Sequence, residues 1–257
     1  MIKEKIVKEN GKWIPLLRKV PENHKAIVIM VHGFTSSKSC QTAELLFRRL
    51  PKVGIGVVTY DQPGHGTEEA LLDELSIDNC INSLKTVEEY VEKIYPKDKI
   101  YYFSSSFGAY ITGLYISTNK HKGNKAFLRS AAVNMPQLIL EPLKEAWCLD
   151  ISKELEEYGY IRPDLGLGET IKIPKGFLKE LRDNNLFEIF DNKKYGLTEI
   201  ELVHGENDSV VDIKNTMEFK NRFGFTMNVI KGEGHSICDN LKSPDKVADL
   251  AIAFYNK

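Results

Sequence analysis

Hydrophobic and polar positions along the chain follow two alternating patterns. Short apolar runs rich in β-branched residues predict buried strands, and stretches with apolar residues three or four positions apart predict amphipathic helices. The predicted strands are 26–31, 56–60, 99–103, 126–133, 200–203 and 226–230. The predicted helices are 40–50, 78–94, a segment that opens at the serine run 104–106, 212–223 and 244–255. This alternation indicates an α/β fold with a doubly wound, mostly parallel sheet flanked by helices.

The first two predicted elements differ from each other in pattern. Residues 2–17 alternate in the β manner around Asn10-Gly11, a pair typical of tight hairpin turns, so we expect an N-terminal hairpin. The next run, Ala26–Val31, has no polar position at all. Such a run suits a strand that helices cover on both faces, as in a parallel sheet.

The alternation stops between residues 135 and 194. This segment is rich in proline, glycine and charge, and it contains short helical patterns and one possible hairpin near Ile171–Ile173. An insertion of this length between two strand-helix units is typical of a lid rather than a linker. We therefore expect a core formed by residues 1–134 and 195–257, with a cap or lid formed by residues 135–194.

Composition and charge narrow the class of protein. The chain has 257 residues, of which 42% are hydrophobic, so it can bury a large core and is not a disordered protein. Lys and Arg number 35 and Asp and Glu 36, so there is no basic excess to attract nucleic acid. No apolar run is long enough to span a membrane, and the N-terminal MIKEKIVKEN lacks the apolar core of a signal peptide. We expect a cytoplasmic protein, and we make no prediction of its oligomeric state.

The four cysteines, Cys40, Cys80, Cys148 and Cys238, are scattered and include no C-x-x-C pair. This spacing predicts neither a zinc site nor a disulfide framework. We expect buried or half-buried free thiols in a reducing compartment.

Serine acyl transfer needs a nucleophile on a sharp turn, a base, an acid that orients the base, and N–H donors for the oxyanion. Ser106 in SSSFG is the candidate nucleophile, since it follows a predicted strand and opens a helix. A strand-to-helix elbow requires small residues two positions before and after the nucleophile, and Ser106 has Ser104 and Gly108 there. Ser105 would have a phenylalanine on each side at that spacing. The alternative is that Ser106 only caps an ordinary helix.

The candidate acid and base each follow a later predicted strand. Asp208, in HGENDSVVD, follows strand 200–203; an Asx turn is the alternative role, and Asp212 is the rival acid, although helix capping explains it well. His235, in GEGHS, follows strand 226–230, and its flanking glycines leave room for the side chain to swing toward a neighbouring loop. Histidine titrates near neutral pH, as a general base must. The alternative for His235 is a surface-loop histidine.

The candidate oxyanion loop is His32-Gly33-Phe34, directly after strand 26–31. The glycine allows the backbone to turn so that the Phe34 N–H faces the site, and the N–H of Phe107, the residue after the nucleophile, would be the second donor. We expect His32 to brace this loop, and His65, in a Gly- and Pro-rich turn, to be structural.

The order and placement of these motifs resemble the α/β-hydrolase superfamily over nearly the whole chain. VHGFTSS resembles its oxyanion loop, YDQPGHGTE its D-x-x-G-H-G turn, SSSFGA its nucleophile elbow, HGENDSVV its acid loop and GEGHS its histidine loop. Within the superfamily the chain is most similar to the small esterases grouped with monoacylglycerol lipases, serine aminopeptidase-like hydrolases and cinnamoyl or feruloyl esterases. The resemblance implies an acyl-serine mechanism with Ser106, Asp208 and His235, and with the Phe34 and Phe107 amides as oxyanion donors.

Two positions depart from the family pattern: Ser104 replaces the usual glycine of the elbow, and Asp212 stands where a proline often closes the acid motif. We expect a serine hydrolase that cleaves a small-molecule carboxylic ester through an acyl-enzyme and needs no metal or cofactor. The alternatives are a thioesterase or peptidase with the same triad, and a non-catalytic binding protein on this fold. Candidate substrate-pocket walls in the cap are Trp147, Phe177, Leu178 and Phe187, for which packing inside the cap is the alternative.

Overall fold

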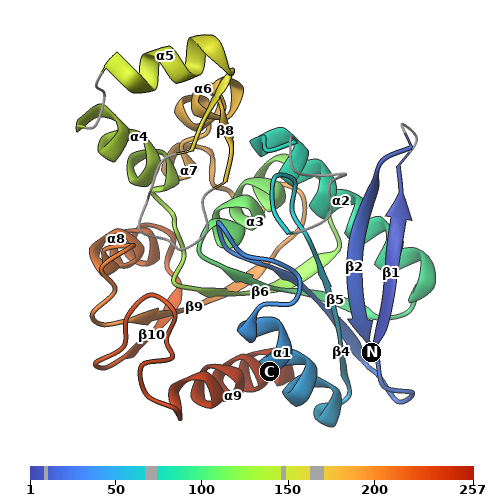
Figure 1. Cartoon of the computed structure of the whole chain (residues 1–257). Coiled ribbons are helices and arrows are strands. Elements are labelled where there is room, and N and C mark those ends of the chain that lie inside the picture. The colour runs from blue at the N-terminus through green and yellow to red at the C-terminus, as the bar shows by residue number, and fades with distance from the viewer. Residues whose placement is uncertain (9–10, 67–73, 146–148, 163–170) are drawn as a thin grey trace.

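An eight-stranded sheet forms the centre of the protein. The computed structural model describes residues 1–8, 11–66, 74–145, 149–162 and 171–257. The sheet order is β1-β2-β4-β3-β5-β6-β9-β10 (Figure 1). The bounds are β1 (Ile2–Val7), β2 (Trp13–Lys19), β3 (Ala26–Val31), β4 (Ile55–Tyr60), β5 (Lys99–Ser105), β6 (Gly123–Arg129), β9 (Glu199–Gly205) and β10 (Thr226–Ile230). The first two strands form an antiparallel hairpin that pairs with β4, and the strands from β4 to β10 are parallel. The predicted doubly wound, mostly parallel α/β fold is confirmed.

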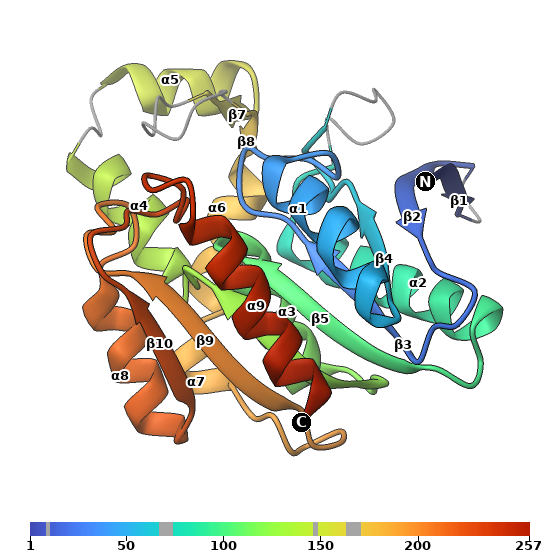
Figure 2. The same ribbon diagram turned by 90° about the horizontal axis from the view of Figure 1, so that it is seen from below.

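Helices cover both faces of this sheet. One face carries α1 (Gln41–Arg49), with the short 3-10 helix η1 (Leu50–Val53) at its end, and α9 (Ser243–Asn256). The other face carries α2 (Ile77–Ile94), α3 (Phe107–Thr118) and α8 (Ile213–Phe223) (Figures 1 and 2).

Strand β3 is apolar at every position because both of its faces are buried. Ile27, Ile29 and Val31 pack in the core on the α2 and α3 side, and Ala26, Val28 and Met30 pack in the core beneath α1 and α9. None of these six residues is more than 1% exposed. The interpretation of an uninterrupted apolar run as a strand covered on both faces is therefore confirmed.

One predicted strand is misplaced at its carboxyl end. The apolar run suggested a strand over 126–133, but β6 ends at Arg129 and Ser130 turns the chain with a φ of 46°. Ala131–Val133 is apolar because this turn itself is buried, with each residue at most 1% exposed. Conversely, β5 and β9 each extend two residues beyond their predicted ends, so that the loops that carry Ser106 and Asp208 start directly from the sheet.

The segment between β6 and β9 contains α4 (Met135–Glu145), α5 (Leu149–Glu157), α6 (Lys175–Asp183), α7 (Leu186–Ile189) and a two-stranded sheet of β7 (Tyr160–Ile161) and β8 (Ile173–Pro174). Helices α4, α5 and α6 gather at the end of the sheet where β6 finishes (Figure 1). The end of this segment instead returns to the helical layer, since the Phe190 ring packs on those of Phe219 and Phe223 in α8.

The described cysteines are free thiols that differ in exposure. Cys80 is buried and Cys40 is half-buried, as expected for free thiols, but the free thiol of Cys238 is exposed because it lies in the surface loop after His235. Cys148 lies outside the described residues.

In the described ranges, no helix combines the length and apolar content needed to cross a bilayer.

Candidate active site

Ser106 occupies a sharp turn between β5 and α3. Its φ is 50° and its ψ is −117°, a conformation that L-residues rarely adopt. Backbone hydrogen bonds to later segments of the chain hold Ser106 in this conformation. The Ser106 N–H donates to the Arg129 carbonyl (2.9 Å), and the Ser106 carbonyl accepts from the amides of Ala109 (3.0 Å) and Ala132 (3.2 Å). The turn therefore fixes Ser106 against the end of the neighbouring strand β6.

The two flanking positions of this turn have different constraints. A Cβ atom at Gly108 would lie 2.3 Å from the Val31 carbonyl oxygen and 2.5 Å from that of His32, so no side chain fits between α3 and β3. Ser104, which replaces the glycine usual in the family, is fully buried, and its hydroxyl lies 2.7 Å from that of Thr112. This hydrogen bond satisfies the extra hydroxyl, so the departure from the motif leaves the elbow intact.

A stability measurement can test the packing at Gly108. The Gly108→Ala variant is expected to lose about 3 kcal/mol or more of unfolding free energy, because its methyl group would overlap two backbone carbonyls that cannot move independently. Gly176→Ala in α6 is the matched control, since a Cβ there meets no atom within 4 Å. The control should gain about 0.5 kcal/mol by restricting the unfolded chain. Equal urea midpoints for the two variants would contradict the steric explanation.

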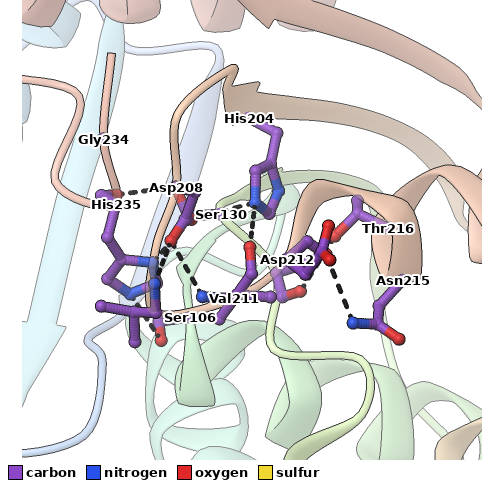
Figure 3. Close-up of polar contacts among 12 residues, drawn as sticks. Ser106, Ser130, His204, Asp208, Val211, Asp212, Asn215, Thr216, Gly234 and His235 are labelled. Carbon is purple, nitrogen blue, oxygen red and sulfur yellow. Dashed lines mark hydrogen bonds and ion pairs between the residues drawn. The ribbon is translucent and has the colours of Figure 1, made fainter.

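Of three side chains predicted from separate motifs, His235 lies within hydrogen-bonding distance of both Ser106 and Asp208 (Figure 3). His235 Nε2 is 3.0 Å from Ser106 Oγ, and His235 Nδ1 is 2.8 Å from Asp208 Oδ2. The other carboxylate oxygen, Asp208 Oδ1, accepts from the amides of Val210 (2.9 Å) and Val211 (2.8 Å). The structure thus brings Ser106, His235 and Asp208 into one chain of hydrogen bonds in which the carboxylate is fixed at both oxygens.

A second histidine, which the sequence analysis did not single out, also contacts the carboxylate. His204, in β9, is fully buried, and its Nε2 lies 2.9 Å from Asp208 Oδ2 and 3.0 Å from the Val211 carbonyl. Burial alone would raise the pKa of Asp208, but hydrogen bonds from His204 and His235 outweigh it and lower that pKa below its usual range. Asp208 is therefore ionised at neutral pH. His204 directly follows the predicted strand 200–203 and lies inside the longer β9, so its position in the sequence does not indicate that its side chain reaches Asp208.

The rival acid, Asp212, has a different position. Its carboxylate accepts from the Lys214 amide (2.9 Å) and caps the N-terminus of α8. Figure 3 shows Asp212 beside Asn215, turned away from His235. The structure does not bring Asp212 to the candidate base.

The two expected oxyanion donors lie beside the nucleophile. A Cβ atom at Gly33 would be 3.3 Å from Ser106 Cβ, so the loop of Phe34 passes directly over Ser106. Phe107 is the first residue of α3, where helix geometry provides no acceptor for the N–H. In the part of the chain that the structure describes, neither amide donates to a backbone carbonyl. Both N–H groups are thus available for a ligand at Ser106.

Two buried histidines support the loops around this site. The His32 ring accepts from the Gln62 amide (3.1 Å), while the Gln62 side chain donates to the His32 carbonyl (2.6 Å). The His65 ring packs against those of Phe34 and Phe107, with centroids 5.3 and 5.9 Å apart. Burial lowers the pKa of His32 to about 4 and that of His65 to about 3. Both imidazoles are neutral at pH 7 and tie the loop of residues 32–34 to the turn after β4.

A cavity of about 330 Å³ opens at Ser106 and His235. Its walls come from the loop after β3 and the start of α1, from the end of β6 and from the loop of His235. They include Gly33–Ser36, Cys40–Thr42, Ser105, Arg129 and Ser236.

The three described cap residues proposed from the sequence, Phe177, Leu178 and Phe187, do not line this cavity. Phe177 is fully buried, and its ring packs against those of Phe34 (6.1 Å) and Phe107 (6.2 Å). Leu178 is buried in the core, and the Phe187 ring packs edge-on against Phe219. Trp147 lies outside the described residues.

The strand order, the serine elbow after β5, the carboxylate loop after β9 and the histidine loop after β10 define the α/β-hydrolase class. The chain belongs to the serine aminopeptidase S33 family of hydrolases, whose family model matches residues 22–166. Membership of this family supports hydrolase activity. None of the curated proteins compared matches the chain.

Three solved structures illustrate the shared fold. Est1E from Butyrivibrio proteoclasticus, with bound ferulic acid, has a TM-score of 0.79 at 16% identity and full coverage of both chains. Mouse alpha/beta hydrolase domain-containing protein 10 has a TM-score of 0.73 at 14% identity, covering 100% of this chain and 99% of that one. The esterase domain of a Rhodothermus marinus protein has a TM-score of 0.71 at 18% identity, covering 98% and 96%.

Proposed function

We propose that the chain is a serine hydrolase that cleaves carboxylic esters through an acyl-enzyme intermediate. The observation that carries this proposal is the continuous hydrogen-bond chain from Ser106 Oγ through His235 to Asp208 Oδ2, with distances of 3.0 and 2.8 Å. A nucleophile in contact with a base, and a base oriented by a third group, is the arrangement that activates a serine hydroxyl.

The mechanism follows from these contacts. His235 Nε2 accepts the Ser106 proton while Oγ attacks the ester carbonyl, and the Phe34 and Phe107 amides donate to the oxyanion. Asp208 keeps the proton of His235 on Nδ1 and stabilises the imidazolium that forms. The imidazolium then protonates the departing alcohol. Water that gives its proton to His235 attacks the acyl-Ser106, and release of the carboxylic acid regenerates the hydroxyl.

Charge in the cavity favours an ester over an aminopeptidase substrate. An aminopeptidase must hold a protonated amine beside the scissile bond, which calls for a carboxylate. Among the described residues, the cavity walls contain no Asp or Glu, and Arg129 places a positive charge there. Est1E was solved with ferulic acid bound, and the Rhodothermus marinus relative is named an esterase domain.

We further propose that residues 135–194 form a cap beside the carboxyl ends of the strands.

Hydrolysis of a p-nitrophenyl ester series, from acetate to decanoate, tests the activity directly. A fluorophosphonate probe tests the nucleophile, and mass spectrometry should locate the label on Ser106 rather than on the adjacent Ser105. Ser105→Ala is the matched control and should still be labelled. A folded protein that neither hydrolyses any ester nor reacts with the probe would contradict the proposal and favour a binding protein on this fold.

A further inference from the structure

Arg129, the last residue of β6, presents a partly unsatisfied guanidinium group in the wall of the cavity at Ser106. Its Nε donates to Ser105 Oγ (3.2 Å), and its Nη1 donates to the carbonyls of Ser236 (2.6 Å) and His235 (3.5 Å). A guanidinium has five N–H donors. In the described parts of the chain, neither N–H of Nη2 has an acceptor, so two donors remain for a ligand.

The charge of Arg129 also lacks a dedicated counter-ion. Among the described residues no carboxylate forms an ion pair with it, and the cavity walls contain no acidic side chain. The nearby carboxylate of Asp208 is already occupied by His204 and His235. Burial lowers the pKa of Arg129, although a guanidinium remains protonated throughout the neutral range. Arg129 is partly buried, and a partly buried cation without a carboxylate partner is unfavourable, so a bound anion would reduce that penalty.

Polar residues in the remaining walls of the cavity suit an anion as well. Ser36 and Thr42 bring hydroxyl groups, and Gln41 brings an amide. These groups can donate hydrogen bonds, and none carries a negative charge.

We propose that Arg129 is a specificity-determining residue that selects esters bearing a carboxylate close to the scissile bond, on either the acyl or the alcohol part. This inference rests on the proposed ester-hydrolase function. The two N–H groups of Nη2 would donate to the carboxylate while Nε and Nη1 stay bound to Ser105 and to the His235 loop. Guanidinium–carboxylate contacts of this kind are among the stronger hydrogen bonds in proteins.

Matched pairs of esters that differ only in a terminal methyl or carboxylate test the proposal. On the acyl side these are ethyl pentanoate and monoethyl glutarate, and on the alcohol side butyl acetate and 4-acetoxybutanoate. The wild type should show a higher kcat/KM for the charged member of at least one pair. Arg129→Met should lower that preference by about tenfold or more, the loss expected for a hydrogen bond to a charged group. Arg129→Lys keeps the charge but lacks the paired N–H donors of the guanidinium, so its preference for the charged ester should lie between those of the wild type and Arg129→Met.

Ser130→Ala separates recognition of the carboxylate from support of the histidine loop. Ser130 Oγ donates to the same His235 carbonyl (2.8 Å) as Arg129 but carries no charge. Its removal should change kcat/KM equally for the charged and the neutral ester, leaving their ratio as in the wild type. A neutral-ester preference of the wild type in both pairs, or the same ratio in Arg129→Met and the wild type, would overturn the proposal. Failure of the underlying function is distinguishable, because the wild type would then cleave neither ester and Ser106 would not react with a fluorophosphonate.

Discussion

Replacement of Ser106 by alanine is expected to lower kcat on every ester by roughly a millionfold, because the variant retains the proposed oxyanion donors but has no oxygen to form the acyl-enzyme. The fold should be unaffected, since the hydrogen bonds that hold the turn come from the backbone of residue 106 rather than from its hydroxyl. The measurements are steady-state hydrolysis, active-site titration of trace wild type, and circular dichroism. An alanine variant with more than a hundredth of wild-type kcat would identify another nucleophile.

The same position should also reveal the energetic cost of the elbow. With a φ of 50°, residue 106 is in a region that glycine enters freely and alanine does not. We therefore expect Ser106→Gly to be more stable than Ser106→Ala by about 1 kcal/mol, the reverse of the usual order of these two residues. Both variants should be inactive. If the glycine variant unfolds at the lower urea concentration, residue 106 is not strained.

Asp208→Asn is expected to lower kcat by about 10⁴-fold, because an amide in place of the carboxylate misorients His235 and no longer stabilises its charged form. Asp212→Asn is the matched control: the same chemical change is made four residues away, at a side chain that caps α8. Asparagine is also a good N-cap, so this control should retain kcat within a few-fold and unfold at nearly the same urea concentration. A larger loss of kcat in Asp212→Asn would assign the acid to Asp212 instead.

The fold was predictable because most of its parallel strands coincide with short apolar or β-branched segments between turns. Ala26–Val31 and Thr226–Ile230 have the predicted bounds, since turns and charged residues flank short β-rich segments. The end of β6 was not predictable in the same way. Ala131–Val133 is as apolar as the strand before it, and only the tertiary structure, in which these residues form a buried turn, distinguishes the two.

Local motifs predicted the residues of the candidate triad but not their surroundings. Ser106 and His235 lie in turns whose glycines and small residues have a local steric explanation. His204 and Arg129 lie within strands, where the sequence gives no sign that one reaches Asp208 and the other the loop of His235. The pocket walls were inferred from large apolar residues in the cap, whereas the cavity is lined mainly by small polar residues after β3.

The segment between β6 and β9 can evolve independently of the sheet. Residues 130–198 leave the sheet at the carboxyl end of β6 and rejoin it at the amino end of β9, where Glu199 pairs with Lys125 in the parallel ladder. The sheet fixes the distance that this segment must span, and the closure entropy of a flexible loop grows only slowly with its length. A new insert between Ser130 and β9 would therefore alter which molecules approach Ser106, while the register of the strands that precede Ser106 and Asp208 stays the same.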